Sequence, residues 1–343
     1  MKPLNAERSN AAATSCWWLL ARDWSARQMS LNFKRGNVIK AAYVFPGQGA
    51  QTVGMGKEFY ETSPEAKRVF DEADRVIGGL TDVIFNGPQE QLTSTAYCQP
   101  AIFTYSIAAL HAFQAHPKFK NIESRFACGL SLGECTAVAA AGGLPFPQAL
   151  KLVERRSAFM EEATKLKRGS MAAVIGFDRD QLIRICFETG AQVANFNSPE
   201  QIVITGETEK VAHASKIIEE RGAKRVIPLD VSGAFHSSLM QPAVAKFKEV
   251  LKGVNFQTPR FPIVSNVDGR PADKPEVIRD NLAKQITSSV QWVKSIQYIA
   301  GQGVNDFIEI GPGNVLKGLI RKINPKLNVY SIRTPQDIDQ LPF

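Results

Sequence analysis

Hydrophobic and polar positions alternate along the first half of the chain in two different periods. Short apolar runs at 40–45 and 125–128 predict strands, and apolar residues three or four positions apart predict helices at 64–77, 99–115 and 147–164. An Ala-rich helix is expected to follow the second strand and to run to about residue 141. Alternation of strands and helices is typical of an α/β core with a parallel sheet.

The pattern changes between residues 166 and 232. Strands are expected at 171–176, 192–196, 201–205 and 225–231, with helices at 179–188 and 207–221. That order is the split β-α-β arrangement of a ferredoxin-like domain. Beyond it, helix–strand alternation resumes, with strands at 261–266 and 305–310.

We therefore predict a hydrolase-like, three-layer α/β core with a parallel sheet and an inserted ferredoxin-like α+β subdomain. The core is discontinuous, at 39–165 and 233–335, the subdomain occupies 166–232, and 336–343 form a C-terminal tail.

Residues 1–38 differ from the rest of the chain. They contain many Ser, Ala, Asn and Arg residues, and their one apolar segment, at 16–21, is too short for a secretory signal or a membrane span. Glu7 and Asp23 argue against an organelle transit peptide, because such peptides contain few acidic residues. Met29 is a second possible start of translation. We expect a disordered or spurious extension of a cytoplasmic protein. Localisation in an organelle stroma or matrix is the alternative, if this segment is a transit peptide.

Composition narrows the classes of protein that fit. The chain has 343 residues, of which 44% are hydrophobic and 22% charged, as in an ordinary globular protein. The five cysteines have no C-x-x-C spacing and the four histidines form no ligand cluster, so we predict a reducing compartment and no metal. A net charge of +8 indicates an acidic partner. The basic residues lack the aromatic interleaving of a nucleic-acid platform, so we expect no nucleic-acid partner.

The candidate chemistry begins at Ser131, in the pentapeptide G-L-S-L-G at 129–133, a nucleophile elbow. A serine between a strand and a helix exposes its Oγ beside N–H groups that can stabilise an oxyanion. The glycine-rich segment 46–49 follows the first strand and is either a plain turn or a second source of N–H donors. His236 is the preferred base, because the small residues at 232–234 favour an exposed loop there.

Seven segments, in order, resemble one enzyme family, the malonyl-CoA:acyl-carrier-protein transacylases. They extend over about residues 40–335 and read F-P-G-Q-G-A-Q (45–51), G-L-S-L-G-E (129–134), V-E-R-R-S-A-F-M (153–160), N-F-N-S-P-E-Q-I-V-I-T-G (195–206), G-A-F-H-S (233–237), Q-I-T-S-S-V-Q-W (285–292) and E-I-G-P-G (309–313). The resemblance implies transfer of a malonyl group from malonyl-CoA to holo-acyl carrier protein, with no bound cofactor. We also expect a monomer.

The resemblance implies roles for the reacting groups. Ser131 would be acylated to a malonyl-serine, and His236 would be its base. A backbone carbonyl near Gln285 would orient the imidazole in place of a triad carboxylate. The backbone N–H groups of Gln48 and Leu132 would form the oxyanion hole, which suits an acyl transfer through tetrahedral intermediates.

The resemblance also implies how the acyl group is selected. Arg156 would bind the malonyl carboxylate in a bidentate pair, although its surroundings alone predict a solvated cation on the charged helix face. Asn197 aligns with a pocket position, but an N-S-P turn explains it almost as well. In related modular acyltransferases, a Phe before the catalytic His accompanies malonyl, and Phe235 fits this because its ring would crowd an α-methyl group. Leu130 replaces the His of most relatives and should pack behind the elbow.

Two basic pairs, Lys224–Arg225 and Arg321–Lys322, are candidate docking residues for an acidic carrier protein. The second pair is expected after the terminal helix of the core. Ordinary solvated charge is the alternative interpretation of both pairs.

Two other functions remain open. A thioesterase or lipase shares G-x-S-x-G and a Ser–His pair, but such hydrolases have an Asp or Glu between the two and no guanidinium for a substrate carboxylate. A docking module that has lost turnover would explain Leu130.

Overall fold

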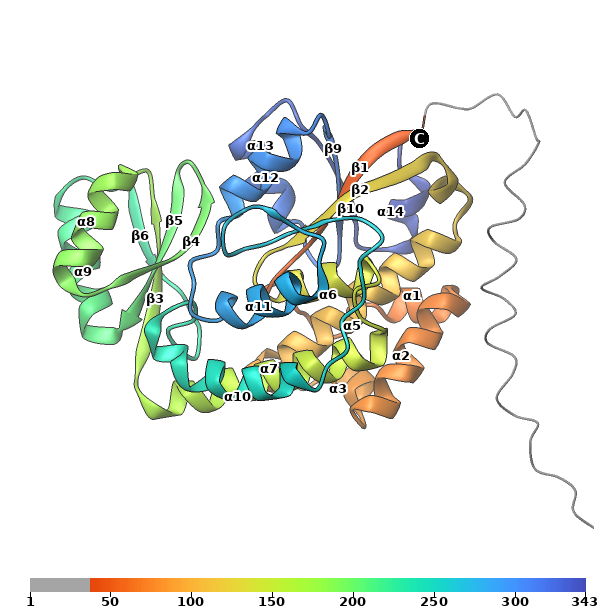
Figure 1. Ribbon diagram of the computed structural model, residues 1–343, viewed down its shortest axis with the longest axis horizontal. Coiled ribbons are helices and arrows are strands. Elements are labelled where there is room, and N and C mark those ends of the chain that lie inside the picture. The colour runs from red at the N-terminus through yellow and green to blue at the C-terminus, as the bar shows by residue number, and fades with distance from the viewer. Residues whose placement is uncertain (1–37) are drawn as a thin grey trace, which may run out of the picture. The chain divides into compact units, whose positions relative to one another are not determined.

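Two sheets organise the part of the chain that the computed structural model describes, residues 38–343 (Figure 1). The prediction for residues 1–38 lies almost wholly outside this range. The larger sheet has the strand order β10-β9-β1-β2-β7-β8, and its strands pair in parallel except for the antiparallel pair β7–β8. These strands are β1 (Ile39–Phe45), β2 (Ile122–Gly129), β7 (Ile263–Val264), β8 (Pro271–Ala272), β9 (Asp306–Ile310) and β10 (Asn328–Ile332).

The central strand β1 shows why the core has three layers. Its apolar sequence buries both faces, as expected for a parallel strand covered on both sides. Ala41, Tyr43 and Phe45 belong to one hydrophobic core, whereas Ala42 and Val44 belong to another. In Figure 1, helices lie on both sides of this strand, which confirms the predicted α/β fold class.

The helices divide between these two cores. The first core includes residues of α2 (Pro64–Val76), α5 (Thr95–Ala115), α6 (Leu132–Ala140), α7 (Phe146–Leu166), α10 (Gln241–Lys252) and α11 (Pro275–Gln285). The second includes residues of α12 (Trp292–Gly301) and α13 (Val315–Ile323). Short helices connect these elements: α1 (Lys57–Thr62), α3 (Leu80–Asn86), α4 (Gln89–Thr93), η1 (Pro117–Asn121) and η2 (Ser238–Met240).

The smaller sheet confirms the ferredoxin-like prediction. Its order is β4-β5-β3-β6 with every pair antiparallel, which is the order that two split β-α-β units produce. The strands are β3 (Gly169–Ile175), β4 (Gln192–Ser198), β5 (Gln201–Glu207) and β6 (Arg225–Pro228), and the helices are α8 (Arg179–Thr189) and α9 (Thr208–Glu220). An isolated parallel bridge between Asn195 and Val290 joins β4 to the segment before α12.

Three segments differ from expectation. The strand expected at 225–231 ends at Pro228, a residue without the N–H that a continuing ladder needs. The strand expected at 261–266 is reduced to Ile263–Val264. The backbone of Asn266 bonds elsewhere, because its N–H donates to Glu134 and its carbonyl oxygen accepts from Gln291. Residues 336–343, assigned to a tail, contain most of α14 (Pro335–Asp339), and Ile338 and Leu341 are buried.

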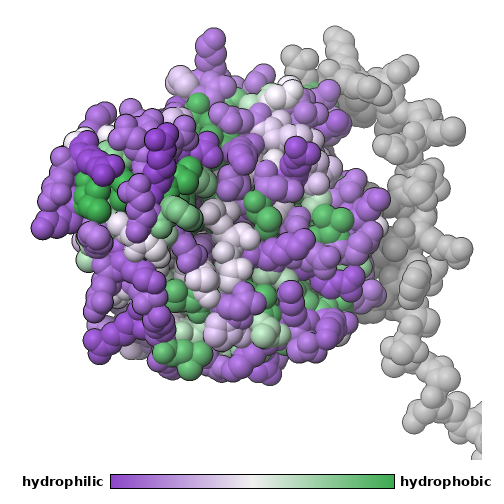
Figure 2. Space-filling view, turned by 60° about the vertical axis from the view of Figure 1, so that its left-hand side comes forward, coloured by the Kyte–Doolittle hydropathy of each residue, from purple (hydrophilic) through white to green (hydrophobic). Residues whose placement is uncertain are grey.

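The surface around the smaller sheet is mostly hydrophilic. Figure 2 shows hydrophobic residues on this face in small, separate areas among polar ones. Within residues 38–343, every helix is too short or too polar to span a bilayer.

Candidate active site

Ser131 stands at the turn between β2 and α6, as predicted, and its backbone is unusual. Its φ of 52° and ψ of −102° lie where residues with a side chain rarely occur. The two flanking glycines permit this turn. A Cβ at Gly133 would lie 2.1 Å from the carbonyl oxygen of Phe45, and one at Gly129 would lie 2.1 Å from the carbonyl carbon of Gly133. The elbow therefore sits tightly against the end of β1, where only glycine fits.

His236 reaches the same hydroxyl from a distant part of the chain. Its Nε2 lies 2.8 Å from Ser131 Oγ, and its Nδ1 lies 2.9 Å from the carbonyl oxygen of Gln285 and 3.1 Å from that of Ser288. Carbonyl oxygens only accept hydrogen bonds, so Nδ1 carries the proton and Nε2 is left to accept one from Oγ. The carbonyl predicted near Gln285 is therefore present, together with a second one.

The loop of His236 is buried, so the prediction of an exposed loop is wrong. His236 is 4% exposed. The small residues before it allow close packing rather than exposure, since a Cβ at Gly233 would lie 2.4 Å from Cγ2 of Thr164. Burial, and secondly the charge of Arg156, lower the pKa of His236 to about 4. The imidazole is therefore neutral at neutral pH, as a base must be.

Arg156 is 1% exposed, so the prediction from its surroundings, a solvated cation, is wrong. The helix period explains this, because Arg156 lies three residues after Val153 and four before Met160, both buried. A careful assignment of helix faces would have placed it inside.

In the described part of the chain, the hydrogen-bond partners of the Arg156 guanidinium are all uncharged. Its Nη1 donates to Gln99 Oε1 at 2.5 Å, and its Nη2 donates to Gln285 Oε1 at 2.8 Å and to Ser131 Oγ at 3.1 Å. Within residues 38–343, no carboxylate pairs with it. Burial lowers the pKa of Arg156, but a guanidinium stays protonated in proteins. The site thus holds a buried cation beside the hydroxyl, and a carboxylate ligand would complement it.

Three polar residues of this site were missed by the sequence interpretation: Gln99, Glu134 and Asn266. Gln99 is a buried amide directly before the apolar run 100–103 of α5, which was a usable signal. Glu134 and Asn266 bond to each other and to the elbow, although 132 residues separate them in the sequence. No local sequence pattern predicts such a contact.

The site opens into a cleft of about 340 Å³. Residues of the core and of β3, β4 and β5 line it, including Ser131, His236, Gln48, Leu132, Asn197, Phe235 and Leu130. Within residues 38–343, the N–H groups of Gln48 and Leu132 have no acceptor, so both are available to a ligand. Asn197 is buried, and its Oδ1 has no partner in the same part of the chain.

The four candidate docking residues lie outside the cleft lining. All four are exposed, and Lys224 is 3.9 Å from Glu200. Arg321 and Lys322 occupy the last turn of α13, so their expected place after the terminal helix of the core is wrong. The chain continues beyond them into β10 and α14.

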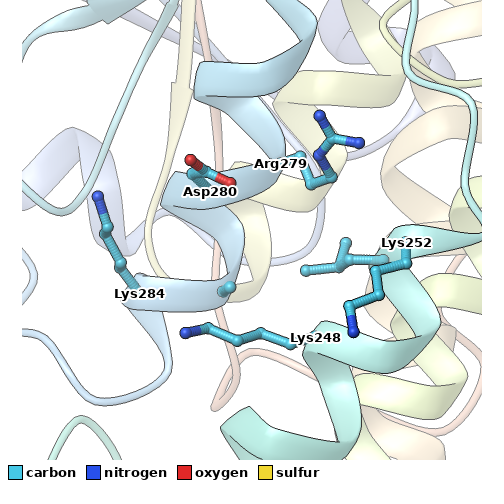
Figure 3. A pocket seen from close by; sticks show the side chains of 7 residues that line it. Lys248, Lys252, Arg279, Asp280 and Lys284 are labelled. Atoms are coloured by element: carbon cyan, nitrogen blue, oxygen red, sulfur yellow. The ribbon is translucent and has the colours of Figure 1, made fainter.

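A second hollow lies away from Ser131, between α10 and α11. Figure 3 shows its charged side chains: Lys248, Lys252, Arg279, Asp280 and Lys284. None of the predicted site residues lines it, so it is a basic surface rather than part of the catalytic cleft.

Comparison with known proteins agrees with this geometry. The family model of the acyl transferase domain matches residues 42–331. The chain is 44% identical over 306 residues to malonyl CoA-acyl carrier protein transacylase of Bacillus subtilis, covering 88% of this chain and 95% of that one. It is 40% identical over 299 residues to the protein of the same name from Escherichia coli O157:H7, covering 86% and 96%.

Solved structures give the same result. The acyl-carrier-protein S-malonyltransferase of Bartonella henselae superposes with a TM-score of 0.84 at 39% identity, covering 88% of this chain and 98% of that one. A malonyl-transacylase in complex with its type II polyketide synthase acyl-carrier protein superposes equally well, at 0.84 and 37% identity, over 88% and 98%. With a family match over most of its length, this chain belongs to the acyl transferase domain family.

Proposed function

We propose that the protein transfers the malonyl group of malonyl-CoA to the phosphopantetheine thiol of acyl carrier protein, for fatty-acid or polyketide synthesis. It is thus an [acyl-carrier-protein] S-malonyltransferase. One observation carries the proposal: Arg156 is a buried guanidinium, 3.1 Å from Ser131 Oγ, without a carboxylate partner in residues 38–343. A buried charge needs a counter-charge, and the malonyl carboxylate supplies one at the nucleophile. The curated relatives carry the corresponding name.

The first half-reaction acylates the enzyme. Ser131 Oγ attacks the thioester carbonyl of malonyl-CoA while its proton passes to Nε2 of His236. The N–H groups of Gln48 and Leu132 stabilise the tetrahedral oxyanion. When this intermediate collapses, the C–S bond breaks, His236 returns the proton to the sulfur, and CoA leaves a malonyl ester on Ser131.

The second half-reaction reverses these roles with a new thiol. The phosphopantetheine thiol of the carrier protein gives its proton to Nε2 of His236, and its sulfur attacks the ester. Collapse breaks the C–O bond, and Ser131 Oγ recovers the proton from the imidazolium. The two carbonyl oxygens at Nδ1, 2.9 and 3.1 Å away, hold the ring and stabilise its charged form without a carboxylate.

Selection of the acyl group follows from Arg156, which contacts Ser131 Oγ, and from residues that line the cleft. Arg156 binds the free carboxylate with two nitrogens, a geometry that a lysine could not reproduce. Phe235 precedes His236 in the sequence and also lines the cleft. Its ring would crowd a methyl group on the α carbon of the acyl group. The α-methyl group changes selectivity by only about 1–3 kcal/mol, so Phe235 modulates a preference that Arg156 establishes. Asn197 contributes an amide to the same pocket.

The competing functions have less support. A hydrolase of neutral esters has no substrate group to neutralise Arg156. A docking module without turnover has no need for a histidine 2.8 Å from the serine, with its other nitrogen held by carbonyl oxygens.

The carrier protein is acidic, and the exposed pairs Lys224–Arg225 and Arg321–Lys322 are its proposed docking residues. Opposite charge mainly raises the association rate and is screened by salt. We propose that the protein acts as a monomer in this encounter.

Replacement of Ser131 by Ala should abolish both the malonyl adduct and transfer to the carrier protein, because no other hydroxyl occupies the elbow. His236→Ala should leave slow acylation at most. Intact-mass measurement after mixing with malonyl-CoA should show a single malonyl adduct on the wild-type protein and none on Ser131→Ala. Transfer by Ser131→Ala at a near wild-type rate would refute the assignment.

Arg156→Ala should lower kcat/KM for malonyl-CoA by about 100-fold or more, because a charge-assisted pair is lost. The kcat/KM for acetyl-CoA, which has no free carboxylate, should fall little or even rise. Competition between the two donors, read by adduct mass, measures the ratio directly. Equal loss for both donors would instead indicate that Arg156 has a structural role.

The pH dependence should report the lowered pKa of His236. The base is neutral above its pKa of about 4, so acylation by acetyl-CoA should be constant down to about pH 5 and fall below it. Arg156→Gln removes a positive charge that disfavours the imidazolium, so the acid limb should move to higher pH. Rapid-quench acylation at donor concentrations well below KM measures kcat/KM, which reports the pKa of the free enzyme, and a wild-type limb near pH 6.5 would contradict the prediction.

Reversal of Lys224 and Arg225 to Glu should raise the KM for carrier protein and flatten its salt dependence. Acylation by malonyl-CoA alone should change only a few-fold. The matched control reverses Lys248 and Lys252, which line the hollow of Figure 3, with the same change in net charge. Steady-state transfer beside stopped-flow acylation, at low and high salt, separates the steps. An equal effect of the control would count against docking at Lys224–Arg225.

A further inference from the structure

The backbone of Ser131 needs an external support. Its φ of 52° is strained for a residue with a side chain, and the first turn of α6 provides no side-chain cap at this position. Released from that conformation, the residue would return to an ordinary N-cap geometry with negative φ and move its Oγ. The nucleophile therefore depends on whatever holds the peptide groups on either side of it.

Two buried side-chain amides bond to those peptide groups. The N–H of Ser131 donates to Oδ1 of Asn266 at 2.7 Å, and Nε2 of Gln285 donates to the carbonyl oxygen of Ser131 at 2.9 Å. The other end of the Asn266 amide donates from Nδ2 to the carbonyl oxygen of Gly129 at 2.7 Å. Both amides are 0% exposed, so water does not compete for these bonds.

Gln285 and Asn266 also bond to one carboxylate, Gln285 through its side-chain amide and Asn266 through its backbone N–H. Oε2 of Glu134 accepts from Nε2 of Gln285 at 2.6 Å and from the backbone N–H of Asn266 at 3.2 Å. These contacts are donors, which suits an ionised carboxylate. Burial raises the pKa of Glu134, while hydrogen bonds from Gln285, Ser265 and Asn266 and the charge of Arg156 oppose that effect.

We propose that Asn266 and Gln285, anchored on Glu134, form a clamp that holds Ser131 in its strained conformation, and that Asn266 is thereby a positioning residue for the nucleophile. The clamp also turns the N–H of Ser131 away from the cleft, towards Asn266. Oxyanion binding is left to Gln48 and Leu132. The inference rests on the proposed function only in taking Ser131 as the nucleophile.

Kinetics of Asn266 variants test the positioning. Asn266→Leu deletes both amide contacts, and misplacement of the nucleophile by about 1 Å costs on the order of 100-fold in rate. We expect kcat for acylation to fall by about that factor, equally for malonyl-CoA and acetyl-CoA, with KM nearly unchanged. This differs from Arg156→Ala, which should act on malonyl-CoA alone. Asn266→Asp keeps the acceptor for the N–H of Ser131 but loses the donor to Gly129. Its kcat for acylation should therefore lie between those of the wild type and Asn266→Leu.

The matched control is Glu309→Gln for Glu134→Gln. Glu309 is buried like Glu134, at 0% against 2% exposed, and it also accepts two N–H bonds, from Leu316 and Lys317, but it does not contact the elbow. Glu134→Gln should slow acylation by both donors, whereas Glu309→Gln should leave it near the wild-type rate below its melting temperature. An equal loss in both variants would overturn the clamp.

A second measurement needs no activity. Glycine adopts a positive φ without strain, so Ser131→Gly should raise the Tm of the otherwise wild-type protein. If Asn266 imposes the strain, the gain in Tm should disappear in the Asn266→Leu background. Where Asn266→Leu does not fold, the gain should become smaller in the Asn266→Asp background, which keeps only the contact to the N–H of Ser131. An equal gain in both backgrounds would refute the clamp. Failure of the proposed nucleophile would appear instead as transfer by Ser131→Ala, whatever the outcome for Tm.

Discussion

The buried charge of Arg156 constrains the rest of the site. A guanidinium at 1% exposure loses the water that stabilised it, and in the described part of the chain its direct partners are two amides and a hydroxyl. Each partner is fixed in turn: the amide of Gln285 is held by Glu134, and the hydroxyl of Ser131 by His236. The same charge helps to lower the pKa of His236 to about 4, so the cation proposed to select the acyl group also favours the neutral form of the imidazole. In the proposed mechanism, selectivity and base strength are therefore coupled through one side chain.

The parallel sheet brings these groups together. The segment 46–49 follows β1, the elbow follows β2, and Asn266 lies two residues after β7, which pairs with β2. Because β1, β2 and β7 run parallel, their carboxyl ends lie at one edge, where open α/β sheets bind ligands. The smaller sheet completes the cleft with residues of β3, β4 and β5. The position of the cleft between core and subdomain thus follows from strand order, and the tight contact of Gly133 with Phe45 fixes the elbow on β1.

Sequence patterns predicted where the helices, the strands and the candidate reacting residues lie. They predicted less well how buried those residues are. The elbow at Ser131 was readable because strand, glycine and helix signals are local, and the ferredoxin-like order was readable because its strands alternate clearly. The burial of Arg156 was not inferred, since charged residues at 154–156 outweighed the helix period. His236 was expected in an exposed loop, because small residues are common in such loops, whereas here they allow close packing. Asn266 and Glu134 could not be found, because their roles arise only when β7 and β2 pair.

Position 130 shows how backbone contacts can leave a side chain free to vary. The N–H of Leu130 donates to the carbonyl oxygen of Phe45, and its own carbonyl oxygen accepts from the N–H of Gly133, both at 3.0 Å. Its half-buried side chain packs against the second hydrophobic core and also lines the cleft. Any residue can supply these backbone bonds, and the imidazole of most relatives is not needed as the base, because His236 already holds Ser131 Oγ at 2.8 Å. An apolar side chain at this position is therefore compatible with an intact nucleophile elbow, and the argument for a docking module that has lost turnover loses its only support.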